Sequence, residues 1–136
     1  MNLNQTRAVE NFKKDFFDNW EISLKQSCPN ISIDVDWESL FSQAKDDDPE
    51  SVANFWKELF FEPINSALES IGRDELGRKA LENLKNITIR STTSSSNSES
   101  AVFDNGTFTI DQHGYAYSES PEERATIWQG ILEKNL

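Results

Sequence analysis

The sequence predicts an α+β fold in which helices come first and a small β-sheet follows. Between Val52 and Ile71 apolar residues recur at steps of three and four, which is typical of one face of a long helix. Around Asn105-Gly106 two short runs alternate apolar and polar residues, which indicates a β-hairpin. The 136 residues are 36% hydrophobic and 27% charged, so we expect a single domain, residues 1–136, with a core of its own.

The stretch from Val52 to Ile71 is the predicted central helix. Asp48 can cap its first turn, and Gly72 follows its last apolar residue. Pro63 lacks a backbone N–H and its ring crowds the carbonyl of Leu59, so we expect a kink or a break there. At about 1.5 Å per residue the segment from Pro49, which follows the cap, to Ile71 is about 34 Å long, so it crosses the molecule and the other elements pack around it.

An N-terminal helix is predicted from about Asn4 or Thr6 to Ser27, because an apolar stripe runs along it and Pro29 follows it. That stripe consists of Val9, Phe12, Phe16, Trp20 and Leu24. From Ile31 to Val35 apolar and polar residues alternate, which predicts a short extended segment. Asp36 then caps a predicted short helix from Trp37 to Ala44. We find no internal repeat in the chain.

A further helix is predicted after the central one, with Asp74 as its cap and Gly77 allowing a close approach to another helix. Its predicted inner face consists of Leu76, Ala80, Leu81 and Leu84. Residues Ser91 to Ser100 are almost all Ser, Thr, Asn and Glu, so we expect a mobile loop.

The strands are predicted to form a three-stranded antiparallel meander from Ile87–Ile89 and the Asn105-Gly106 hairpin. A two-residue turn places Phe103 opposite Phe108 and Ala101 opposite Ile110 on the buried face. After a loop, Asp111 to Glu119, Ser120 and Pro121 open a predicted C-terminal helix that closes the domain.

The charge of the chain limits its partners. The formal charge is −11 and the pI is about 4.4. Such a surface repels phosphate backbones and anionic lipid, so we expect no nucleic acid and no membrane as partner, and favour a basic protein. The sequence shows no basic-then-apolar leader and no apolar run long enough to span a bilayer, which predicts a cytoplasmic protein.

The sequence contains no catalytic pattern. His113 is the only histidine and Cys28 the only cysteine, and neither has a companion nucleophile or base nearby in the sequence. A calcium loop starting at Asp46 fails, because Ser51 replaces the required glycine and Lys57 the required late glutamate. We therefore predict a protein that is not an enzyme and holds no metal or cofactor.

The strongest charge feature is the acidic segment, which we define as residues Asp34 to Glu50. Its net charge is −6, seven acids less Lys45, within 17 residues. We expect Asp36 and Asp48 to act as helix caps, while the other five carboxylates bind a basic partner or are only solvated. The predicted partner-binding carboxylates are Asp34, Glu38, Asp46, Asp47 and Glu50.

Phe61 lies off the apolar stripe of the central helix, beside Phe60. Two interpretations stay open for its side chain: an exposed contact for a partner or a second subunit, or burial beneath the sheet. We therefore include Phe61 among the partner-binding residues and expect a monomer or a weak homodimer.

In size, acidity and lack of catalytic motifs, the chain is similar to bacterial immunity proteins, which inhibit nuclease-type toxins. The similarity implies a non-enzymatic inhibitor, because a phosphate-binding toxin is basic and an acidic inhibitor associates with it rapidly. An acidic secretion-type chaperone or adaptor is the alternative, but the helix-first order of elements disfavours it. A small enzyme that uses dispersed carboxylates ranks last.

Overall fold

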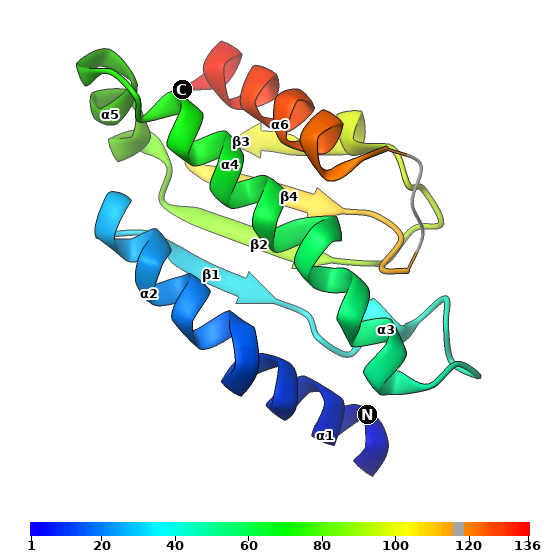
Figure 1. The fold of residues 1–136 in the computed structure, drawn as a ribbon. Coiled ribbons are helices and arrows are strands. Elements are labelled where there is room, and N and C mark those ends of the chain that lie inside the picture. Colours follow the sequence, from blue (N-terminus) through cyan, green and yellow to red (C-terminus); the bar gives the residue numbers. More distant parts are fainter. Residues whose placement is uncertain (116–118) are drawn as a thin grey trace.

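A computed structural model describes residues 1–115 and 119–136, so the predicted loop Asp111 to Glu119 lies partly outside the described residues. These residues form an α+β fold in which one four-stranded sheet is covered by helices on one face (Figure 1). The strand order is β1-β2-β4-β3. The strands are β1 (Ser32–Val35), β2 (Asn86–Arg90), β3 (Val102–Asp104) and β4 (Thr107–Asp111).

The predicted antiparallel meander is wrong, although its hairpin is confirmed. Asn105 and Gly106 have φ of 50° and 82°, and Phe103 pairs with Phe108 as expected. However, β4 rather than β3 lies beside β2, and the two strands are parallel. The extended segment at Ile31–Val35 contains β1, which joins β2 in parallel and makes the sheet mixed. A hairpin turn determines only its own pair of strands, so it did not reveal which strand lies next to it.

Two long helices run side by side in the same direction across the sheet (Figure 1). Each consists of an α-helix, five π-helical residues and a second α-helix. The first contains α1 (Leu3–Phe12), Lys13–Phe17 and α2 (Asp18–Ser27), and the second contains α3 (Pro49–Trp56), Lys57–Phe61 and α4 (Glu62–Ile71).

Pro63 neither breaks nor simply kinks the central helix, which is helical from Pro49 to Ile71. Instead the π-helical segment precedes the proline, and the N–H of Glu62 donates to the carbonyl of Lys57, five residues earlier. Pro63 has no N–H to give the carbonyl of Leu59. That carbonyl accepts a hydrogen bond from Arg124 Nη1 at 3.3 Å instead.

The two long helices share a sequence pattern, so the expectation of no internal repeat is wrong. Val-x-Asn-Phe occurs at Val9 and at Val52, and Lys-x-x-Phe-Phe followed by an acid occurs at Lys13 and at Lys57. Trp56 is the one extra residue between the two parts in the second copy. In both copies the five residues of Lys-x-x-Phe-Phe are the π-helical ones.

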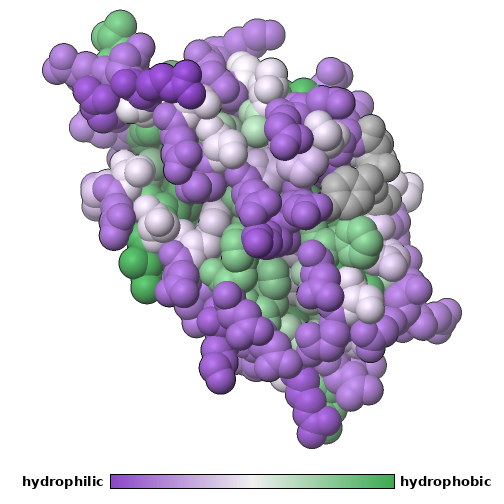
Figure 2. Space-filling view, viewed as in Figure 1, coloured by the Kyte–Doolittle hydropathy of each residue, from purple (hydrophilic) through white to green (hydrophobic). Residues whose placement is uncertain are grey.

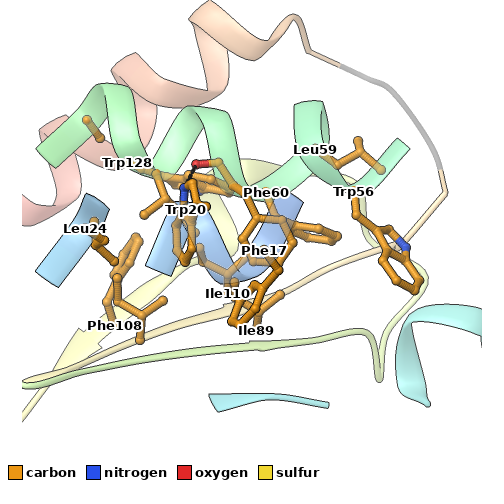
Figure 3. Close-up of a cluster of buried hydrophobic side chains, with 14 of the residues drawn as sticks. Phe17, Trp20, Leu24, Trp56, Leu59, Phe60, Ile89, Phe108, Ile110 and Trp128 are labelled. Atoms are coloured by element: carbon orange, nitrogen blue, oxygen red, sulfur yellow. Dashed lines mark hydrogen bonds between the residues drawn. The ribbon is translucent and has the colours of Figure 1, made fainter. Parts of the chain in front are cut away.

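The core lies between the sheet and the helices. Ile87, Ile89, Phe108 and Ile110 point toward the helices and are at most 2% exposed. They meet aromatic side chains from the helices, among them Trp128 of α6 (Pro121–Asn135) (Figure 3). The opposite face of the sheet is mostly polar. Thr88 pairs there with Thr109, which is also paired with exposed Val102.

The smaller helices depart from their predicted form. Only Ser39–Phe41 is helical, as a single 3-10 turn, within the predicted helix Trp37–Ala44. Leu76, in α5 (Glu75–Ala80), is 82% exposed and so not part of an inner face. Gly77 is confirmed as a close approach, because a Cβ there would lie 1.6 Å from the carbonyl oxygen of Ile71.

Candidate functional site

The acidic segment lies at one end of the molecule, where β1 ends and α3 begins (Figure 1). Asp34 is on the outer face of β1, Glu38 follows the strand, and Asp46 and Asp47 are in the loop before α3. Glu50 is in the first turn of α3. All five predicted partner-binding carboxylates are exposed, so the segment presents them to solvent.

The predicted cap at Asp48 is confirmed, and Asp36 makes a similar bond two residues before Glu38, which directly precedes the 3-10 turn. Asp36 Oδ1 accepts from the N–H of Ser39 at 3.2 Å, and Asp48 Oδ2 accepts from the N–H of Ser51 at 3.1 Å. These bonds explain two of the seven carboxylates, because each satisfies an N–H that the start of a helical turn leaves unpaired. Of the other five, Glu50 lies in the first turn of α3 and accepts a hydrogen bond from Asn11 Nδ2 at 2.9 Å.

Little positive charge neutralises those five carboxylates. The amino group of Met1 lies 2.9 Å from Glu38 Oε1 and, by this hydrogen bond and its charge, lowers the pKa of Glu38. Among the described residues, Asp34, Asp46, Asp47 and Glu50 have no cationic group within 4.0 Å. Within the same residues, no three His, Cys, Asp or Glu side chains come together as a metal site.

A network of hydrogen bonds attaches the acidic segment to the residues that follow β2. Ser42 Oγ donates to the carbonyl of Ser91 at 3.0 Å, and Ser91 Oγ donates to Gln43 Oε1 at 2.7 Å. Gln43 Nε2 also donates to the carbonyl of Thr93 at 3.2 Å. The start of the predicted mobile loop is therefore packed against the segment, with Ser91 only 1% exposed.

Asp111 extends this network at the end of β4. It accepts from Arg90 Nε at 2.9 Å, from the N–H of Thr92 at 2.7 Å and from the Thr92 hydroxyl. Burial would raise the pKa of Asp111, but the bonds from Thr92 and Arg90 outweigh it and lower the pKa. Sequence reasoning missed this group, because the contact between Asp111 and Thr92 depends on β2 and β4 being neighbours.

Phe61 is not on the surface. Its side chain is fully buried, so the interpretation as an exposed partner contact is wrong. Its ring centroid lies 4.9 Å from that of Trp20 and 5.5 Å from that of Phe12. Trp20 Nε1 also donates to the carbonyl of Phe61 at 2.8 Å (Figure 3). The extra residue of the π turn accounts for an inward-facing residue that lies off the stripe of a regular helix.

The two residues considered for nucleophilic chemistry have structural contacts. His113 is partly buried; its Nδ1 accepts from the N–H of Tyr115 at 3.0 Å and its own N–H donates to the carbonyl of Ser95 at 2.6 Å. Cys28 is 6% exposed, and burial raises the pKa of its thiol. A raised pKa disfavours the nucleophilic thiolate.

No helix among the described residues is both long enough and apolar enough to cross a bilayer. Comparisons with protein families, with characterised proteins and with solved structures find no match to this chain.

Proposed function

We propose that this protein is a non-enzymatic binding domain whose acidic segment docks a basic protein partner. The supporting observation is the exposure of Asp34, Asp46, Asp47 and Glu50 without a cation within 4.0 Å among the described residues. With Glu38 they make up the proposed docking carboxylates. Exposed carboxylates without a nearby cation keep their full charge available to a basic surface.

Electrostatics explains what such a surface does. A net charge of −6 within 17 residues attracts a basic surface over about one Debye length, roughly 8 Å at physiological salt. The bonds from Ser42 and Gln43 to residues 91–93 hold part of the segment against the sheet before any partner arrives. Such pre-organisation reduces the entropy lost on binding.

The class of partner follows from the same chemistry. Proteins that cut or bind nucleic acid present basic surfaces to phosphates, and an acidic inhibitor can cover such a surface. We propose an immunity or inhibitor protein that neutralises a basic, nuclease-like toxin. The inhibitor would act by occluding the basic surface and would need no catalytic group of its own.

The test is to capture the partner from the source cells, identify it, and measure the association rate by stopped flow. Asp46→Asn with Asp47→Asn removes two exposed charges and spares both caps. Association should slow by roughly threefold to tenfold at low salt, and the rates should converge near 1 M salt, where the Debye length is about 3 Å.

A matched control removes two charges at the other end of the sheet. Glu82→Gln with Glu133→Gln changes the net charge by the same amount, and both side chains are exposed. Equal slowing by the two double variants would mean that net charge alone acts and that the segment is not the docking site.

The variant His113→Ala should inhibit the partner as well as the unchanged protein does. Loss of inhibition in a folded His113→Ala variant would favour the enzyme alternative.

A further inference from the structure

A groove runs between the two long helices on the helical face of the molecule. One part is lined by residues of α1, α3 and both π-helical segments, and the other by residues of α2, α4 and the start of α6. Phe16 lines both parts and joins them. In Figure 2 green apolar surface appears on this face between purple hydrophilic side chains.

The lining of the groove is aromatic. Phe12 and Phe16 are partly exposed there, and buried Trp20 and Pro63 contribute to the wall. A π-helical segment from each long helix meets at the middle, where Lys57 Nζ lies 5.4 Å from the centroid of the Phe16 ring. π-helical turns inside α-helices often occur at functional sites. Aromatic residues, Phe among them, are enriched at the cores of protein interfaces.

The border of the groove is acidic. Four carboxylates line it, from Asp15, Glu50, Glu62 and Glu122, and Lys57 is the one basic residue among the described lining residues. The net charge of the lining is therefore −3, four acids less one base. Lys57 lies 3.5 Å from Glu62 Oε1, so its charge is shared with that carboxylate. Glu50 belongs both to this groove and to the acidic segment.

We propose that this groove binds an amphipathic basic helix of the partner protein. Two helices packed side by side leave a groove that accepts a third helix, with apolar residues at i, i+3, i+4 and i+7 toward the aromatic lining. Lysines and arginines flanking that stripe would face the carboxylates on either side. A second copy of this chain is disfavoured, because two copies, each of charge −11, would bring like-charged borders together.

The inference rests on the proposed function and assigns separate roles to the two surfaces. Exposed charges at the rim of a contact mainly change the association rate, whereas anchors in a pocket mainly change the dissociation rate. The acidic segment would therefore determine how fast the partner arrives. The aromatic groove would determine how long it stays.

The probe is a synthetic helix of about 18 residues, roughly five turns, made only of Leu and Lys with Leu on one face. A peptide of the same composition with the Leu stripe scrambled is the peptide control. Titration into the ¹⁵N-labelled protein should shift the amides of Phe16, Asn54 and Lys57 first. The scrambled peptide should bind at least about tenfold more weakly, because it cannot place its Leu residues together.

Protein variants then test the lining and the border separately. Asp15→Asn with Glu122→Gln should weaken peptide binding by roughly threefold to tenfold, whereas Asp18→Asn with Glu123→Gln, exposed neighbours outside the groove, should change it less than about twofold. Phe16→Ala should speed dissociation by about tenfold or more, against little change for Ile22→Ala, which is 61% exposed outside the groove. Thermal unfolding checks that each variant is folded.

Several outcomes would overturn the inference. Amide shifts that map to the acidic segment alone, or equal effects of the two charge-removing variants, would place binding elsewhere. If the amides of the groove shift when the protein concentration is raised without peptide, a second copy of the chain is the occupant. If no basic probe binds anywhere on the protein, the proposed function is wrong. If the peptide binds equally well to the Phe16→Ala variant and with its Leu stripe scrambled, only the assignment of the groove is wrong.

Discussion

The two long helices carry the same sequence pattern and the same π-helical segment, but they lie in different surroundings. In the second helix Phe60 and Phe61 are both fully buried, because α4 lies between α2 and α6 (Figure 1). In the first helix, at the side of the sheet, Phe17 is buried but Phe16 stays partly exposed. The shared sequence pattern therefore coincides with a shared π-helical backbone. The place of each helix in the helical layer decides how much of each Phe side chain is buried.

The two long helices also differ at Pro63. The first helix has its π-helical segment without any proline, and Asn19 stands where the second helix has Pro63. A proline is thus not required for a π turn in this pattern. What distinguishes the second helix is that another element, α6, supplies a donor from Arg124 to the carbonyl of Leu59.

The largest expected effect comes from truncating the equivalent aromatic residue in each copy. Phe60→Ala should lower the free energy of unfolding by about 3–5 kcal/mol, the usual cost of emptying a fully buried Phe site. Phe16→Ala should cost only about 1 kcal/mol, because the Phe16 side chain is only partly buried in the folded protein. Denaturant unfolding measures both, and equal midpoints would mean that the two copies are buried alike.

Arg124→Met tests the dependence of the second helix on α6. Arg124 is fully buried, and its Nη2 lies 3.8 Å from Glu119. Removing it leaves the carbonyl of Leu59 without this donor and Glu119 without its cation, so we expect a loss of about 3 kcal/mol in the free energy of unfolding. Arg78→Met is the control, since Arg78 donates to the carbonyl of Gly72 from an exposed position and should cost about 0.5 kcal/mol.

Two tryptophans allow a measurement of one hydrogen bond between the helices. Trp20 Nε1 donates to the carbonyl of Phe61, whereas Trp56 Nε1 is buried without an acceptor among the described residues. Trp20→Phe and Trp56→Phe remove the same ring volume. Trp20→Phe should therefore cost about 1 kcal/mol more in the free energy of unfolding, and the opposite order would show that this bond contributes nothing.

The smallest effect is expected for Pro63→Ala. The new N–H can donate to the carbonyl of Leu59, which offsets the greater freedom of the unfolded chain, so stability should change by less than about 1 kcal/mol. We expect the π-helical segment to persist, as it does without proline in the first helix. Backbone amide and Cα shifts report on it, and a return to regular α-helix at Lys57–Phe61 would make the proline its cause.

The sequence predicts the local features of the helices and the hairpin, but not the contacts between distant elements. Spacing and capping residues located the central helix and its cap at Asp48, and Asn-Gly located the hairpin, because each signal lies within a few residues of its effect. For the candidate site, the acidic segment and its exposure were likewise predictable. The repeat was also readable in the sequence, but the one-residue shift at Trp56 hides it from a search for a constant period.

By itself, the sequence determined the α+β class, the N-caps at Asp48, Asp74 and Ser120, the hairpin register and the concentration of acids between Asp34 and Glu50. The tertiary structure alone decided the strand order, the burial of Phe61, the groove beside Phe16 and the bond from Arg124 to Leu59. The physical reason is separation along the chain. A cap or a turn satisfies backbone groups within a few residues, whereas Arg124 and Leu59 meet only when α6 packs against the central helix.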